Sequence, residues 1–245
     1  MISKELIQNR IDNFWGYGNL GGKYWFIGME EGHDLDSNAL EIRFNETFNK
    51  STVDIIEGMP SIIKHLKWFK PPFPPVQRTY KGYIIIKLFI ELGRMPSIEE
   101  IRLFQLNQLG REFVDGRAND HSILELMPLP ASSTSENDWL YKDFGIDDLS
   151  TRKKYLRKYK PIQIKKLRNL IKKHNPKLVV FYSIIYLKDW ESVANCDLIK
   201  IQKKQYIGSN GKTLFCVLPH PVARGVSNKD WNCWGQEIYN RLLGL

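Results

Sequence analysis

Apolar residues along the chain follow two spacings, one typical of amphipathic helices and one of buried strands. Residues 3–16 carry apolar side chains at helical spacing and end at a glycine, which predicts an N-terminal helix. Short apolar runs predict strands, and they lie at residues 24–27, 122–126, 178–182, 197–201 and 214–219. Because helical patterns separate these runs, the chain is predicted to be an α/β protein, a three-layer α/β/α sandwich with a central, mostly parallel sheet of four or five strands.

Proline and glycine mark the limits of the predicted helices. Residues 79–94 predict a helix, and a second helix after Pro96 has the capping-box spacing of Ser97 and Glu100. Between Arg152 and the strand at 178–182 the pattern predicts two basic helices interrupted at Pro161. Further helical patterns predict a short helix at 187–193 and a closing helix at the C-terminus.

The length of 245 residues favours one domain, spanning residues 1–245. No apolar run approaches the roughly 18 residues of a membrane span, and the N-terminus is amphipathic, so we expect no membrane association and a cytoplasmic location. The three cysteines, Cys196, Cys216 and Cys233, are too far apart for a zinc knuckle and are expected to be reduced. We therefore expect no metal and no cofactor.

Positive charge is concentrated in one part of the chain. The net charge is +9, and residues 152–177 contain twelve Lys and Arg and no acid. This composition predicts contacts with nucleic-acid phosphates, although a solvated basic helix face is the alternative. The predicted contacts at the start of the segment come from four residues, Lys153, Lys154, Arg157 and Lys158.

Residues 23–32, KYWFIGMEEG, are the first candidate functional segment. The apolar run ends at Gly28, and Glu30 and Glu31 stand before Gly32. Open α/β sheets bind ligands at the carboxyl ends of parallel strands, so GMEEG is predicted to be a functional loop. The alternative is a tight turn, in which the two glycines supply only backbone freedom and the acids are solvated.

Four segments together resemble the uracil-DNA glycosylase superfamily, as a divergent member. They are WFIGMEEG, ILELMPLP, NPKLVVFYS and VLPHPVARGVSN, and their order and spacing cover residues 12–240. The resemblance implies a uracil-DNA glycosylase-like fold, with residues 52–110 as a helical and Pro-rich insertion. It also implies a DNA glycosylase, which hydrolyses the N-glycosidic bond of a damaged or modified base flipped into a pocket.

Cleavage of this bond builds positive charge on the sugar and negative charge on the departing base. The resemblance implies that Glu30 positions water or stabilises the sugar and that His220 stabilises the base, with Glu31 as a further candidate acid. The implied base-binding residues are Gly28, Met29, Gly32, Phe44 and Glu125, and the implied DNA contacts after His220 are Arg224, Ser227 and Asn228.

Glu125 stands where relatives commonly have an asparagine that reads the pyrimidine edge. An ionised carboxylate only accepts hydrogen bonds, so Glu125 would favour bases with amino groups, such as cytosine or adenine, over uracil. Two other functions stay open. One is a catalytically inactive member that binds nucleic acid or a nucleotide. The other is a nucleotide-binding domain with GMEEG as its phosphate loop, which two carboxylates would oppose by repelling a phosphate. The expected partner is DNA, and the expected state is a monomer.

Overall fold

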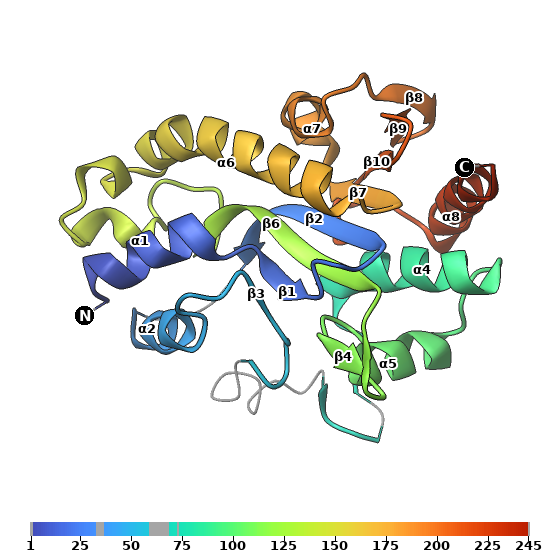
Figure 1. The fold of residues 1–245 in the computed structure, drawn as a ribbon, viewed down its shortest axis with the longest axis horizontal. Helices are drawn as coiled ribbons and strands as arrows, with labels where there is room; N and C mark the ends of the chain where they lie inside the picture. Colours follow the sequence, from blue (N-terminus) through green and yellow to red (C-terminus); the bar gives the residue numbers. More distant parts are fainter. Residues whose placement is uncertain (1, 33–36, 59–68, 73, 245) are drawn as a thin grey trace.

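The computed structural model describes residues 2–32, 37–58, 69–72 and 74–244. In this part of the chain, an eight-stranded mixed sheet has the order β3-β1-β6-β2-β7-β10-β9-β8 (Figure 1). The strands are β1 (Gly16–Gly18), β2 (Tyr24–Gly32), β3 (Thr52–Val53), β6 (His121–Ala131), β7 (Leu178–Tyr182), β8 (Ile199–Gln202), β9 (Gln205–Ser209) and β10 (Leu214–Leu218).

The centre of the sheet is parallel and its margins are mixed. Strands β6, β2, β7 and β10 are parallel neighbours. At one margin β1 runs antiparallel to β6 and parallel to β3, and at the other β9 runs antiparallel to β10 and β8. The α/β class is therefore confirmed, but the sheet has more strands than the four or five predicted. Strands β1 and β3 have three and two residues, too few to show an apolar pattern.

Helices cover both faces of the sheet (Figure 1). Trp25 and Ile27 face a core built with α1 (Lys4–Asn13), α6 (Arg152–His174) and α7 (Leu187–Ala194). Phe26 faces the opposite core, built with α4 (Arg78–Leu92), α5 (Ile98–Asn107) and α8 (Asn228–Leu243). A strand between two covered faces is apolar at every position, which explains the continuous run at 24–27.

Helices α4 and α5 form an integral layer of the fold. Ile84 and Ile85 of α4 are fully buried in the same core as Trp234 of α8. The predicted capping box of Ser97 and Glu100 is present at the start of α5. The part of 52–110 that the structure describes therefore helps to cover one face of the sheet.

Helix α6 is continuous through Pro161, so the predicted interruption is wrong. Proline in a helix interior costs about 3 kcal/mol relative to alanine. Buried side chains lie on both sides of Pro161, with Tyr155 and Tyr159 before it and Leu167 and Ile171 after it. Their packing against the sheet holds the two halves in one helix and offsets this cost.

Strands β2 and β6 both extend beyond the predicted limits. The segment GMEEG is the second half of β2, and Gly28, Glu30 and Gly32 pair with β6, so the predicted loop is strand. Strand β6 continues through Pro128 and Pro130. The register of β6 with β2 shifts between Glu30 and Gly32, opposite the two prolines, as expected where a strand residue has no N–H to donate.

Smaller elements connect this framework. They are α2 (Ser37–Glu46), the hairpin of β4 (Phe113–Val114) and β5 (Arg117–Ala118), and the 3-10 helices η2 (Leu140–Asp143), η3 (Asp147–Leu149) and η4 (Ile184–Tyr186). None of the helices in the described ranges has the length and hydrophobicity of a membrane span. The same ranges contain no group of three or more His, Cys, Asp or Glu arranged to hold a metal ion.

Candidate functional site

The carboxyl ends of the four parallel strands meet at one edge of the sheet. The strands that follow β2 in the chain, β3 and β6, lie on one side of it, and those that follow β7, which are β8, β9 and β10, lie on the other side of β7. Connections that leave neighbouring strands in opposite directions open a crevice at this edge, which is the usual ligand site of open α/β sheets. By this rule a ligand-binding crevice is expected between the ends of β2 and β7.

Glu125, Gly28 and Tyr182 form a row across three neighbouring strands at this edge. Gly28 pairs with Glu125 of β6, and Ile27 pairs with Phe181, which places Gly28 beside Tyr182 of β7. A Cβ atom at position 28 would overlap Glu125 Oε2, so the carboxyl group lies over the glycine. Glu125 Oε2 and the Tyr182 hydroxyl are both shielded from solvent and have no hydrogen-bond partner. The row therefore holds two unused polar groups on the α4 side of the sheet.

Aromatic side chains of α4 cover this row. The Tyr83 ring meets the Tyr182 ring edge-on, with centroids 4.4 Å apart. Tyr80 lies one turn earlier, 6.1 Å from Tyr83, and is only partly buried. Aromatic faces beside polar groups are the usual lining of a pocket for a planar ligand, and Tyr80 is the accessible face here.

Burial raises the pKa of the Glu125 carboxyl well above its usual range, and the nearby charges of Glu31 and Glu30 raise it further. Other atoms of Glu125 reach solvent, but Oε2 does not. The neutral carboxyl group has one donor and one acceptor, as an amide does. The expectation that Glu125 favours amino groups assumed an ionised carboxylate, whereas this environment favours the neutral form.

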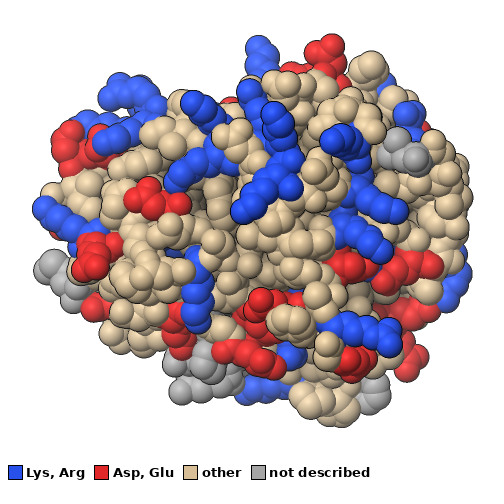
Figure 2. Space-filling view, in the orientation of Figure 1, with Lys and Arg blue, Asp and Glu red and all other residues tan. Residues whose placement is uncertain are grey.

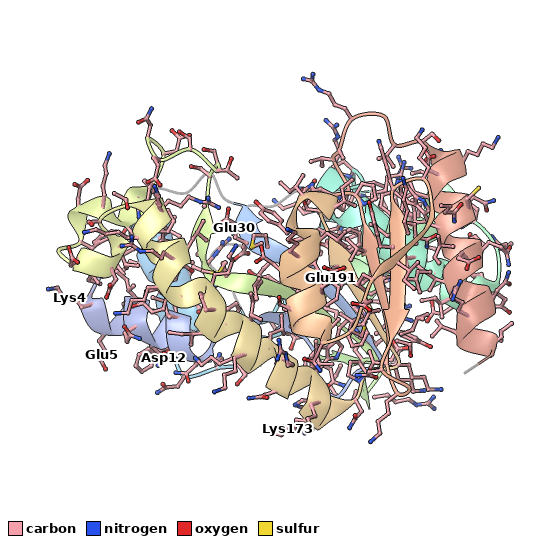
Figure 3. All side chains as sticks on the ribbon, turned by 90° about the horizontal axis from the view of Figure 1, so that it is seen from above. Lys4, Glu5, Asp12, Glu30, Lys173 and Glu191 are labelled. Carbon is pink, nitrogen blue, oxygen red and sulfur yellow. The ribbon has the colours of Figure 1, made fainter. Side chains whose placement is uncertain are left out.

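Glu30 is an internal acid that is already paired. Its carboxylate binds Arg152, the first residue of α6, and both side chains are about nine-tenths buried, at 10% and 9% exposure. Figure 3 shows Glu30 toward the N-terminal end of α6, with Lys173 at the far end of the helix. Burial raises the pKa of Glu30, and Arg152 opposes the shift. Glu30 Oε2 is shielded from solvent and has no hydrogen-bond partner, so one oxygen of the carboxylate is unused in the ion pair.

Glu31 is the centre of a buried ionic cluster. It accepts from Arg10 of α1 at 3.1 Å, lies 3.2 Å from Arg43 of α2, and accepts from the Tyr17 hydroxyl of β1. Arg10 also donates to Thr47 at 2.9 Å. These contacts join α1, α2 and β1 to β2, so Glu31 has a structural position. Its charge also acts on the row, because after burial it is the next cause that raises the pKa of Glu125.

His220 follows β10, and its ring is part of a turn. Nδ1 accepts the backbone N–H of Val222 at 3.3 Å, and burial lowers the pKa of the imidazole. The neutral ring therefore carries its proton on Nε2, which is a donor. No hydrogen bond joins His220 to Glu30, because β7 separates their strands and two strand spacings are about 9.6 Å. A bound ligand would have to bridge them.

Three predicted base-binding residues have other surroundings. Phe44 is 1% exposed and lies in the α6-side core, where Arg10 covers its ring at 5.3 Å, so the predicted stacking role is contradicted. Met29 lies in the same core at 8% exposure, which leaves it no ligand-facing surface. Gly32 ends β2 and is exposed. Of the predicted base-binding residues, only Gly28 and Glu125 lie together.

The predicted DNA contacts divide into free and occupied side chains. Lys154 pairs with Asp147 at 2.9 Å, and Lys158 pairs with Asp148. Ser227 caps α8, and Asn228 accepts from Lys81 at 3.3 Å. Among the predicted DNA contacts, the exposed basic side chains that form no ion pair in the described ranges are Lys153, Arg157 and Arg224. Figure 2 shows a row of Lys and Arg in the upper part of the molecule, with acidic side chains mainly in the lower half.

Sequence reasoning missed Tyr182, Tyr83, Tyr80 and Arg152 as site residues. Tyr182 had a usable signal, because it is the polar-tipped last residue of an apolar run that ends at the ligand-binding edge. The α4 tyrosines had none, because their helix is separated from the motifs in the sequence. Arg152 was counted only as part of the basic segment.

Two cavities lie away from this edge. One of about 390 Å³ is lined by residues between α5 and β4, including Arg111 and Phe113. Another of about 290 Å³ includes Tyr24 and Lys177, which lie at the amino ends of the strands. Neither cavity is lined by a residue of the row. We take the row as the candidate site because it combines unused polar groups with aromatic side chains. No protein-family model and no curated protein matches the chain.

Proposed function

We propose that the protein is a DNA glycosylase-like enzyme with a uracil-DNA glycosylase-like fold, acting on a base flipped into the crevice. The observation that carries the proposal is the row of Glu125, Gly28 and Tyr182. Its two unused polar groups suit the hydrogen-bonding edge of an uncharged heterocycle, because both are shielded from water and burial raises the pKa of Glu125 and of Tyr182, which favours their neutral forms. A phosphate would gain no positive partner there.

In this mechanism the three acids have separate tasks. Glu125 reads the base as a neutral carboxylic acid, with its hydroxyl donating and its carbonyl accepting. Glu30 acts on the sugar side, where its free Oε2 orients water or faces the developing positive charge. His220 Nε2–H donates to the base as negative charge grows on it. Glu31 holds the strand that carries Glu30.

A base edge that matches Glu125 has one donor beside one acceptor. Uracil, hypoxanthine, cytosine and adenine each present such an edge with no second donor along it, whereas the Watson–Crick edge of guanine has a second donor, N2–H, beside its N1–H and O6 pair. Excision activity is therefore expected on bases of the first kind. This expectation differs from the one for an ionised carboxylate, which two adjacent donors would suit best.

The second candidate is a catalytically inactive protein that binds nucleic acid or a nucleotide. The Glu30–Arg152 ion pair favours it, because a paired carboxylate is a weaker base and a weaker partner for a sugar cation. The two candidates share the crevice and differ in whether the glycosidic bond is broken.

Excision by the wild-type protein is expected on at least one duplex or single-stranded oligonucleotide that contains uracil, hypoxanthine, xanthine or an alkylated base. The measurement is strand cleavage at alkali-labile sites. Glu30→Gln is expected to reduce the rate by about 10²–10³-fold, the usual cost of losing one preorganised electrostatic group. Glu191→Gln, on α7, is the matched surface control. Binding of the whole panel without cleavage would select the inactive alternative.

Binding to DNA is expected to weaken with salt. Each phosphate neutralised on duplex DNA contributes a slope of about −0.9 in a plot of log affinity against log salt. Lys153→Ala/Arg157→Ala is expected to reduce this slope, because both side chains are exposed and form no ion pair in the described ranges. Lys154→Ala, whose partner is Asp147, is expected to change it less. An affinity independent of salt would contradict the DNA-binding proposal.

A further inference from the structure

The cavity of about 290 Å³ lies at the amino ends of the parallel strands, beside the C-terminal ends of α4 and α8. These two helices pack side by side on one face of the sheet (Figure 1). The cavity is lined by Tyr24 of β2, Ile90 of α4, and Tyr239 and Leu242 of α8. Tyr24 comes four residues before Gly28, about 13 Å along the strand, so the cavity is separate from the crevice row.

Two lysines of neighbouring strands also line the cavity. Lys177 directly precedes β7, and Lys212 lies in the turn before β10, the parallel neighbour of β7. The N–H of Leu214 donates to the carbonyl of Lys177 at 2.9 Å, and the N–H of Lys212 donates to Asn210 Oδ1 at 3.1 Å. These hydrogen bonds fix the backbone of both lysines at the same edge of the sheet.

The charges of these two lysines are not neutralised by acids. Lys177 and Lys212 are exposed, and neither forms an ion pair within the described ranges. Two acids, Asp120 and Glu91, lie near the tyrosine of β2, but both pair with Lys87 and neither lines the cavity. The C-terminal ends of α4 and α8 add about half a negative charge each. Two lysines exceed this by about one unit, so the cavity attracts anions.

We propose that this cavity is a second binding site, for a small aromatic anion. Its ring would pack against Tyr24 and Tyr239, and its phosphate or carboxylate group would lie between Lys177 and Lys212. Apolar and aromatic walls with a few polar groups are the usual composition of small-molecule sites. Because such sites have volumes of about 300–1,000 Å³, this one suits a ligand of one or two rings. The proposal does not depend on the function proposed for the crevice.

The test measures the binding of 1-naphthyl phosphate and 1-naphthoate to the full chain by isothermal titration calorimetry. Both are expected to bind, and 1-naphthol and inorganic phosphate are each expected to bind at least tenfold more weakly. Lys177→Ala/Lys212→Ala is expected to weaken 1-naphthyl phosphate by about tenfold, because two charge contacts are lost. Lys200→Ala/Lys203→Ala removes the same charge from exposed positions at β8 and is expected to bind as the wild type does.

Two further measurements locate the ligand and define its class. Amide NMR shifts are expected at Lys177 and Gly211, which line the cavity, with none at Gly28. Tyr239→Leu keeps an apolar wall and is expected to weaken 1-naphthyl phosphate without weakening octanoate. Shifts at Gly28 alone, or equal affinity of the wild type and Lys177→Ala/Lys212→Ala, would overturn the site. Tighter binding of octanoate than of 1-naphthoate would overturn the aromatic class of ligand.

Discussion

Glu31→Ala is expected to lower the free energy of unfolding by about 3–5 kcal/mol, the usual cost of removing one partner from a buried ion pair. The loss leaves Arg10 and Arg43 without their carboxylate, and their side chains are 2% and 9% exposed. It also removes the acceptor of the Tyr17 hydroxyl. Urea unfolding measures the change as a shift of the midpoint at constant slope.

Glu57→Ala provides the matched control for Glu31→Ala. Glu57 also pairs with an arginine, Arg111 at 2.7 Å, but it is 74% exposed. Exposed pairs contribute about 0–1 kcal/mol, so this variant is expected to unfold nearly as the wild type does. If Glu31→Ala lost excision while it unfolded like Glu57→Ala, Glu31 would be a catalytic acid, as the sequence alone suggested.

Glu125→Ala is expected to reduce excision by about 10²–10³-fold, because it removes the donor and the acceptor that read the base. Glu125→Gln is expected to stay within about tenfold of the wild type, since an amide offers the same pair of groups as a neutral carboxyl. As pH rises through the raised pKa of Glu125, wild-type activity is expected to fall while Glu125→Gln keeps its activity. Loss of activity in Glu125→Gln at neutral pH would contradict the neutral-acid role.

Glu125 also leads us to expect a change in the free energy of unfolding with pH. Above the unfolded-state pKa of about 4.3, the native protein keeps a proton on Glu125 that the unfolded chain has lost. The contribution of Glu125 to stability is therefore present at lower pH and is lost as pH rises toward its folded pKa. Glu125→Gln lacks this loss, so its stability relative to the wild type is expected to increase by about 1.4 kcal/mol per pH unit in that interval. A difference that does not change with pH would show that Glu125 is ionised.

The sequence predicted those elements whose signal is local. The apolar runs at 178–182 and 214–218 are strands because both faces of the sheet are covered, and Ser97 and Glu100 cap a helix because their spacing alone allows it. The end of β2, by contrast, depends on a strand that is distant in the sequence. Residues 28–32 contain two acids and two glycines, and they are strand because β6 supplies hydrogen bonds along the segment.

The sequence predicted only the part of the candidate site that depends on local signals. The ligand-binding edge and Glu125 follow from strands and their last residues, which the pattern shows. The separate tasks of Glu30 and Glu31 do not follow from it, because the two are adjacent in the chain and differ only in their distant partners. Arg152 lies 122 positions from Glu30, and Arg10 and Arg43 lie on two other helices. Phe44 has the aromatic ring that stacking on a base requires, but the fold buries that ring.

A side chain at position 28 would overlap the Glu125 carboxyl group, so substitutions at these two positions affect each other. The atom that a methyl group at position 28 would meet is the end of a flexible side chain, so Gly28→Ala would displace the carboxyl group and spare the backbone. In the presence of Glu125→Ala the same methyl group would have room. The effect of Gly28→Ala is therefore expected to depend on the residue at position 125, so the two positions are coupled.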